Sequence, residues 1–161
     1  MPSGNYTAAV LTISDSSSRG DRRDVSGPAV ADLLRQKSFE VVATEVVPDE
    51  QTTIQGALMR LADGVSLVVT TGGTGIAKRD VTPEATQAVC ERLIEGVAER
   101  MRAEGTKKTP LAVLSRGVCG VRGQTVILNL PGSPAGAVDS LASVVDILPH
   151  ILDLLAGKTG H

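Results

Sequence analysis

Residues 66–75 have the sequence Ser-Leu-Val-Val-Thr-Thr-Gly-Gly-Thr-Gly, and this stretch decides the fold class. Its apolar run predicts a strand over residues 66–71 that is covered on both sides, as in a parallel sheet. Three glycines in the next four residues predict a loop over 72–82 whose backbone approaches a ligand closely. A tight turn explains one of these glycines, so we favour a phosphate-binding loop. The GxGxxG and GK[ST] patterns of dinucleotide folds and P-loops are absent.

Strand and helix patterns alternate on both sides of this stretch. The predicted strands are residues 8–13, 40–47, 66–71, 111–114 and 125–130, with the direction of the last two left open. The predicted helices begin at Pro28, before Ile54, at Pro83 with Gly96 as a candidate break, and at Pro134 with a kink or new start at Pro149. Such alternation predicts an α/β fold: a doubly wound, mostly parallel sheet with helices on both faces, in a single domain over residues 1–161. The glycine-rich residues 115–124 form either a hairpin or an excursion.

Composition excludes several classes of function. The chain has 161 residues with 16 Lys and Arg against 18 Asp and Glu, so nothing indicates broad binding to nucleic acid or to anionic membranes. Only two histidines occur, His150 and His161, which argues against a Ser-His-Asp triad and a histidine-ligated metal. Cys90 and Cys119 are spaced like neither a metal site nor a redox pair, and buried thiols are favoured over a reactive role. Without a leader or an apolar run of about 20 residues, we expect a cytoplasmic protein.

Ligands of open α/β sheets bind beyond the carboxyl ends of the strands. The segments that leave those ends are residues 14–27, 48–50, 72–83 and 131–134. In three of them a small or hydroxyl residue precedes proline, which is typical of a helix cap and a first helical residue: Gly27-Pro28, Thr82-Pro83 and Ser133-Pro134. Helix N-termini with free amides would then meet at one edge and attract phosphates.

Charged residues in these segments are candidates for phosphate and metal chemistry. Lys78, Arg79 and Asp80 precede a predicted helix; they could neutralise phosphate and orient a metal, or form a solvated loop. Asp49 precedes another helix, where an N-cap is the simpler interpretation. A Mg²⁺ ion bound together with substrate phosphates needs only one or two carboxylates, and Asp49 and Asp80 leave neighbouring strand ends.

The remaining candidates have equally simple structural explanations. Ser14 and Asp15 leave the first strand, and the following loop sets three arginines against Asp21 and Asp24, as in a solvated loop. Ser115, Arg116 and Arg122 form either a positive patch suited to a phosphate or part of a surface hairpin. Turn chemistry alone would account for Pro131, Gly132 and Ser133.

Taken together, these motifs resemble the molybdopterin adenylyltransferase family of molybdenum cofactor biosynthesis. The motifs are Leu11–Ser16, Ser26–Pro28, Val47–Glu50, Gly72–Gly75, Arg79–Thr86, Leu114–Arg116 and Asn129–Ser133. The resemblance covers nearly the whole chain in order. It implies a doubly wound α/β enzyme that transfers the adenylyl group of ATP to the phosphate of molybdopterin, with Mg²⁺ as the metal. A non-catalytic molybdopterin-binding or scaffolding module is the alternative, which the lack of a linker or second domain disfavours.

The resemblance also implies roles for individual residues. Asp49 and Asp80 match the family's catalytic and metal-binding aspartates. The positions that match its pterin and nucleotide pocket are Ser14, Asp15, Gly72, Gly73, Thr74, Gly75, Arg79, Ser115, Arg116, Pro131, Gly132 and Ser133. Val25 and Lys78 depart from the commoner arginine and proline at their positions.

The last predicted helix carries apolar side chains around more than one face, with Val144 expected to point outward. We therefore expect a homo-oligomer, which the family resemblance implies is a trimer. The resemblance also implies that the product passes to a molybdenum-insertion protein.

Overall fold

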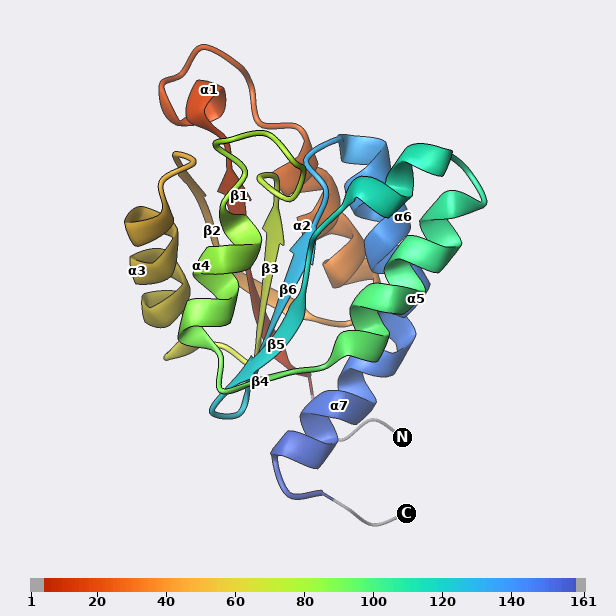
Figure 1. The fold of residues 1–161 in the computed structure, drawn as a ribbon. Coiled ribbons are helices and arrows are strands. Elements are labelled where there is room, and N and C mark those ends of the chain that lie inside the picture. Colours follow the sequence, from red (N-terminus) through yellow and green to blue (C-terminus); the bar gives the residue numbers. More distant parts are fainter. Residues whose placement is uncertain (1–4, 159–161) are drawn as a thin grey trace.

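The computed structural model describes residues 5–158. They form a six-stranded sheet with helices on both faces (Figure 1). The strand order is β2-β1-β3-β6-β5-β4. The strands are β1 (Thr7–Ile13), β2 (Glu40–Val47), β3 (Leu67–Thr71), β4 (Arg92–Leu93), β5 (Cys119–Arg122) and β6 (Thr125–Leu130). The first four strands in this order are parallel to one another. At one edge, β5 runs antiparallel to β6, and β4 runs antiparallel to β5. This confirms the predicted α/β class. His161 lies outside the described residues.

The helices divide between the two faces of the sheet (Figure 1). On one face lie α3 (Gln51–Ala62) and α4 (Thr82–Val89). On the other lie α2 (Ser26–Gln36), α5 (Glu95–Thr106), α6 (Pro134–Val144) and α7 (Leu148–Leu155). Each face has its own hydrophobic core: alternate residues of β3 enter them, with Leu67 and Val69 on the α2 face and Val68 on the α3 face. The central strands are therefore mostly apolar, because both of their faces are buried.

A buried polar cluster fixes the carboxyl ends of β3 and β6 against α4. The Asn129 side-chain amide donates to Thr70 Oγ1 at 3.1 Å and to Thr86 Oγ1 at 2.9 Å. Its Oδ1 accepts from the backbone N–H of Val118 at 3.1 Å. All of the polar side-chain groups of Asn129 are thus used, as a buried amide requires.

The prediction of a strand over 111–114 is wrong. These residues belong to a 3₁₀-helix, η1 (Pro110–Leu114), which Thr109 caps by accepting from Leu111 N. Pro110 lacks an N–H and suits the first turn of a helix, so the apolar run is helical although its side chains are exposed. The remaining predicted strands are confirmed.

The short strands β4 and β5 lie where the sequence predicts, respectively, a continuous helical region and a glycine-rich segment of undecided form. The helical region predicted from Pro83 ends at Val89 and resumes only at Glu95, because β4 pairs with β5 between them. Gly96 is therefore not the break; it lies in the first turn of α5. Residues 115–124 contain β5, which confirms the hairpin alternative: β5 pairs with β6 through a turn at Gly123.

Only one of the three predicted caps is confirmed. Ser133 Oγ accepts from Gly136 N at 3.1 Å and caps α6. Thr82 is instead the first residue of α4, and its hydroxyl donates to Gly72 O at 3.0 Å. Gly27 lies inside α2, which begins one residue earlier at Ser26. The loop before α2 also contains a short helix, α1 (Asp15–Ser18).

A new helix begins near Pro149, as the sequence predicts. A short 3₁₀-helix, η2 (Val145–Ile147), separates α6 from α7. Val144 does not point outward; it is 1% exposed, within the core of the α2 face. The second apolar face of the last predicted helix is covered within the chain, because α6 packs against both α2 and α5.

The two cysteines are free thiols inside the fold. Burial raises the pKa of Cys119 to about 12 and that of half-buried Cys90 to about 11. Both are therefore protonated at neutral pH, which confirms the packing role over the reactive one.

The two ends of the described chain lie together at the amino edge of the sheet (Figure 1). The Tyr6 hydroxyl donates to Asp153 of α7, and Lys158 Nζ lies 5.5 Å from the centre of the Tyr6 ring. No helix within residues 5–158 has the length and apolar character needed to cross a lipid bilayer.

Gly72→Ala should destabilise the fold by more than about 2 kcal/mol, because Gly72 has a left-handed backbone and no space for a Cβ. Its φ is +97°, and an added Cβ would lie 2.2 Å from Ile13 O. Gly56→Ala is the matched control, because Gly56 has open space on α3 and alanine there should add roughly 0.5–1 kcal/mol. Urea unfolding of both variants measures the difference. Equal stabilities would contradict the steric argument.

Candidate functional site

The loops that follow β1, β2, β3 and β6 meet at the carboxyl edge of the sheet (Figure 1). Gly72 N donates to Leu130 O at 3.1 Å, which joins the loop after β3 to the end of β6. Gly72 and Gly73 have φ values of +97° and +68°, which glycine adopts freely. Thr82 N closes the other end of the loop by donating to Gly73 O at 3.1 Å. The glycine-rich loop thus turns sharply over the ends of two buried strands.

The backbone amides of this loop are available to a ligand. Within residues 5–158, the N–H groups of Gly73, Thr74 and Gly75 donate to no protein acceptor. Successive unpaired amides in a turn, close to the N-terminus of a helix, form a concave anion-binding surface. This arrangement fits a phosphate cradle better than a simple turn.

Two cavities adjoin the loop and share a wall. The first, here called the α5 cavity, has a volume of about 470 Å³ and lies between the loop, α5, η1 and the start of α6. The second, the α1 cavity, has about 500 Å³ and lies between the loop, α1 and the residues before α2. The residues common to both linings are Gly73, Asp80, Gly132 and Ser133. Two ligands, one in each cavity, would therefore both lie beside these shared residues.

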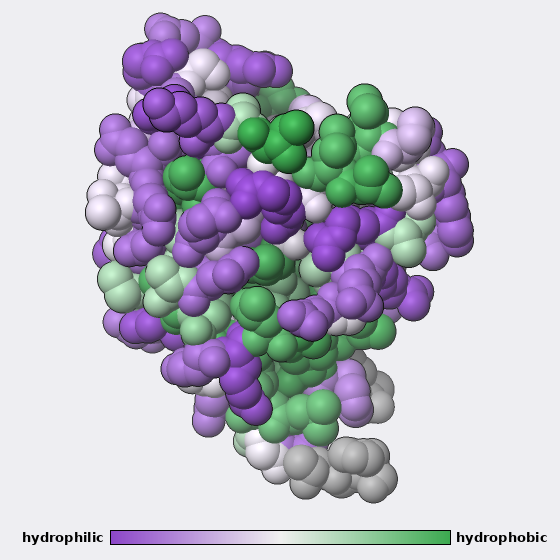
Figure 2. Space-filling view, viewed as in Figure 1, coloured by the Kyte–Doolittle hydropathy of each residue, from purple (hydrophilic) through white to green (hydrophobic). Residues whose placement is uncertain are grey.

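The two cavities differ in chemical character. The α5 cavity has aliphatic lining from Met101, Leu111 and Leu114, and Figure 2 shows the hydrophobic surface over η1 beside it. The α1 cavity is lined by Arg22 and Arg23, which form no ion pair within residues 5–158. Asp24, which the sequence sets against these arginines, instead accepts from Thr12 Oγ1 and Gly27 N. The guanidinium groups of Arg22 and Arg23 are therefore free to pair with an anion.

Asp49 is held at the wall of the α1 cavity by reciprocal hydrogen bonds with Asp15. Asp49 Oδ2 accepts from Asp15 N at 2.8 Å, and Asp15 Oδ1 accepts from Asp49 N at 3.0 Å. The interpretation of Asp49 as a helix cap is wrong, because the N-cap of α3 is Glu50 and has no side-chain cap bond. The local sequence could not show this, since the partner of Asp49 is 34 residues away.

Charges around Asp15 and Asp49 shift their acidity in opposite directions. Arg79 forms a bidentate pair with Asp15, with Nε and Nη2 at 2.6 and 3.0 Å from the carboxylate oxygens. This pairing lowers the pKa of Asp15 to about 2. Burial, and then the neighbouring carboxylates of Asp15 and Asp80, raise the pKa of Asp49. The α1 cavity thus has a carboxylate whose ionised form would gain from a nearby cation.

Asp80 lies on the shared wall, next to the glycine-rich loop. Its Oδ2 accepts from Ala77 N at 3.0 Å and would lie 2.8 Å from a Cβ added to Gly75. Asp49 similarly lies 3.2 Å from where Gly73 would carry a Cβ. The absent glycine side chains therefore allow both carboxylates to approach the loop.

The donor set fits a magnesium ion that also binds a ligand. Within residues 5–158, Oδ1 of Asp49 and Oδ1 of Asp80 accept no hydrogen bond, so each aspartate has an oxygen to offer. The same residues contain no cluster of three acidic, histidine or cysteine side chains that could hold a metal. Mg²⁺ commonly binds through one or two carboxylates plus substrate phosphates, so this pair suits that mode.

The structure brings most of the predicted site residues together. All but three line one or both cavities; the exceptions are Asp15, Arg79 and Arg116, whose charged groups are engaged in ion pairs. The predicted patch of Arg116 with Arg122 does not form. Arg122 lies at the other end of β5 and donates to Val89 O at 2.9 Å.

Comparison with known proteins identifies the family and the fold. The family model described as "Probable molybdopterin binding domain" matches residues 9–150. The chain belongs to this molybdopterin-binding family. The resemblance that the sequence motifs predict is confirmed.

Relatives in the molybdopterin-binding family are similar over most of their length. A molybdopterin adenylyltransferase of Helicobacter pylori is 40% identical over 153 residues, covering 92% of this chain and 87% of the relative. One of Escherichia coli K12 is 44% identical, covering 92% and 84%. The crystal structure of the molybdopterin biosynthesis enzyme MoaB of Thermus thermophilus is 51% identical with a TM-score of 0.90, covering 95% of this chain and 98% of that one.

Sequence reasoning missed that residues of α5 and η1 line the α5 cavity. Met101 and Arg102 of α5, with Leu111, Ala112 and Leu114 of η1, line it. No local signal marks these residues as a ligand surface. The strand predicted over 111–114 would have buried Leu111, Ala112 and Leu114 in the sheet.

Replacing Asp49 and Asp15 by asparagine should have opposite effects on stability. Asp49→Asn removes a partly buried charge that lies near other carboxylates while keeping an oxygen for Asp15 N, so we expect a higher melting temperature than wild type at pH 7. This gain should shrink as the pH falls through the raised pKa of Asp49, because the wild-type carboxyl is then protonated. Asp15→Asn loses the Arg79 pair and should melt lower at pH 7, with the deficit narrowing as the pH falls toward the Asp15 pKa of about 2.

Thermal unfolding of the three proteins between about pH 2 and 8 measures both trends. A lower melting temperature for Asp49→Asn at pH 7 would mean that the Asp49 carboxylate stabilises the fold.

Proposed function

We propose that this chain is a molybdopterin adenylyltransferase, which transfers AMP from ATP to the phosphate of molybdopterin and releases pyrophosphate. The observation that carries the proposal is the wall shared by the two cavities, where Asp80, Gly73 and Ser133 face both. A transfer between two bound substrates needs such adjacent sites. The names of the 40–44% identical relatives support the same activity.

The reaction breaks one phosphoanhydride bond and forms another. A phosphate oxygen of molybdopterin attacks the α-phosphorus of ATP, and pyrophosphate leaves with the electron pair of the broken P–O bond. Such a transfer asks the protein for position and charge stabilisation rather than covalent chemistry. The free amides of Gly73, Thr74 and Gly75 would bind phosphate oxygens, and Arg22 and Arg23 would add positive charge in the α1 cavity.

Asp49 and Asp80 would hold Mg²⁺ through the oxygens that accept no hydrogen bond. When bound, Mg²⁺ neutralises charge on the phosphates and on the departing pyrophosphate. Arg79 positions Asp49 indirectly, since it anchors Asp15, which in turn binds both the N–H and the carboxylate of Asp49. Ser14, Gly72, Ser115, Pro131 and Gly132 complete the linings of the two substrate sites.

Pyrophosphate release tests this function, and two aspartate variants locate it. Wild-type protein with ATP, Mg²⁺ and molybdopterin should release pyrophosphate, and omission of molybdopterin or Mg²⁺ should abolish release. Asp80→Asn and Asp49→Asn should lower kcat by roughly 10²-fold or more while the proteins stay folded, because each removes a carboxylate that would hold Mg²⁺ at the reacting phosphates. Asp63→Asn, an exposed aspartate at the end of α3, is the control and should keep full activity.

No release by the wild-type protein would exclude the enzyme and favour a molybdopterin-binding module. Activity loss that merely tracks a fall in melting temperature would assign the two aspartates to folding.

We also propose that the protein works as a homo-oligomer, with a trimer favoured by the family resemblance, and hands its product to a molybdenum-insertion protein in the cytoplasm. Apolar side chains that α2 and α5 leave uncovered support self-association: Ile147 and Leu154 near the C-terminus are 41% and 40% exposed, and Val42 on edge strand β2 is 51% exposed. Light scattering at micromolar concentration should give about three times the chain mass of 16.6 kDa. A mass of one chain would refute the oligomer.

A further inference from the structure

Arg116 lies in the segment 115–118 between η1 and β5, and its side chain donates four hydrogen bonds to the loop that carries Asp80 and to Glu84 of α4. Nε donates to Gly75 O at 2.8 Å, and Nη2 donates to Asp80 O at 2.7 Å. Nη1 donates to the Glu84 carboxylate at 2.6 Å, and Nη2 makes a second contact with it at 3.3 Å. Arg116 N also donates to Thr74 O at 2.8 Å. One residue therefore links Thr74, near the start of the loop, to Glu84, in the first turn of α4.

The geometry leaves Arg116 little to offer a substrate phosphate. A guanidinium has five N–H donors, and all three of its nitrogens already donate to the loop or to Glu84. Arg116 lines neither the α5 cavity nor the α1 cavity. Its charge is balanced by Glu84, whose pKa the pairing lowers. These contacts differ from the substrate-binding role that the sequence resemblance implies.

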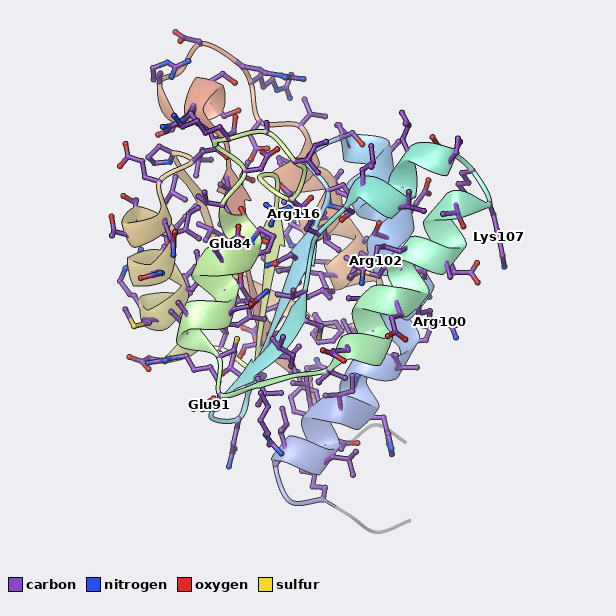
Figure 3. All side chains as sticks on the ribbon, in the orientation of Figure 1. Glu84, Glu91, Arg100, Arg102, Lys107 and Arg116 are labelled. Carbon is purple, nitrogen blue, oxygen red and sulfur yellow. The ribbon has the colours of Figure 1, made fainter. Side chains whose placement is uncertain are left out.

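The segment that carries Arg116 is itself anchored to α5 and β6. Arg102 Nη1 donates to Gly117 O at 3.0 Å and to Ser115 O at 3.4 Å, on either side of Arg116. Val118 N donates to the buried Asn129 side chain, which ties the segment to the sheet. Figure 3 shows Arg116 between Glu84 of α4 and Arg102 of α5. The guanidinium thus connects a rigid part of the fold to a loop.

The position of Asp80 depends on this connection. Arg116 holds the carbonyls of Gly75 and Asp80, and the Asp80 carboxylate packs against Gly75. Apart from Arg116, the loop between Gly75 and Asp80 is held by the bonds between Ala77 and Asp80 and by the pair of Arg79 with Asp15. An error of about 1 Å in the place of a reacting group can slow a reaction about 10²-fold. The bidentate fork of arginine fixes such a position better than the point charge of lysine.

We propose that Arg116, paired with Glu84, is a positioning residue that clamps the glycine-rich loop so that Asp80 faces the reacting phosphates. This role rests on the proposed adenylyl transfer. It makes Arg116 a determinant of kcat rather than of substrate affinity, and it assigns Glu84 to the same unit.

Arg116→Lys and Glu84→Gln test the clamp through steady-state kinetics. We expect Arg116→Lys to lower kcat roughly 10- to 100-fold, with KM for ATP and molybdopterin within about twofold of wild type. Glu84→Gln should lower kcat by a smaller factor with the same KM pattern. Because the two residues act as one unit, the double variant should be about as slow as Arg116→Lys alone. Arg60→Lys is the control, since Arg60 forms a similar bidentate pair with Glu45 away from the cavities and should keep wild-type kinetics.

Amide hydrogen exchange gives a readout that does not need substrate. The N–H groups of Ala77, Asp80 and Thr82, which bond within the loop, should exchange faster in Arg116→Lys than in wild type, while those of β3 stay protected.

Three results would overturn the clamp. A rise in KM with unchanged kcat would place Arg116 on a substrate. Slower turnover with unchanged loop exchange would mean that Arg116 acts without moving the loop. Wild-type kinetics in both single variants would show that the contacts carry no catalytic role. If instead the wild-type protein releases no pyrophosphate, the proposed function fails, and the exchange data alone still show whether Arg116 holds the loop.

Discussion

Direct backbone packing at the ends of β1, β3 and β6 is the constraint on which the rest of the site depends. At Gly72 a side chain would lie 2.2 Å from Ile13 O, and Gly132 approaches Gly72 Cα so closely that its own Cβ would be 3.3 Å away. With no side chains between them, the three strand ends stay close enough for their loops to share ligands. The strand order also brings Asp49 close to the loop that holds Asp80, because only β1 lies between β2 and β3.

The charged side chains around this junction have two separate tasks. Those in ion pairs, such as Asp15 with Arg79 and Arg116 with Glu84, join one loop to another at the edge of the cavities. Exposed ion pairs add little to global stability, so their value lies in fixing local geometry. Others, such as Arg22, Asp49 and Asp80, line the cavities and form no ion pair within residues 5–158. Motif comparison does not separate these groups, since both occur in the same short segments.

The sequence predicts what depends on neighbouring residues and fails where a distant partner decides. The runs that become β1, β3 and β6 are apolar because helices cover both of their faces, and this pattern is visible in the chain itself. Strand β4 has two residues and exists only through its pairing with β5, so no local pattern indicates it. Residues 111–114 are apolar yet exposed, since Pro110 and Thr109 impose a helical turn. The sequence motifs include Asp49 and Arg116, but the bonding partners of these two residues lie 34 and 32 residues away, so only the fold reveals them.

The contact between Tyr6 and α7 determines how the molecule can be tethered. Because Tyr6 and Asp153 are joined at the amino edge of the sheet, both ends of the described chain leave from the side opposite the cavities (Figure 1). An affinity tag, a surface linker or a second catalytic unit attached at either end would extend away from the glycine-rich loop. The same closeness allows the two ends to be connected by a short peptide and the chain to be reopened elsewhere on the surface, for example at Gly20 in the exposed turn after α1, without cutting a strand of the sheet.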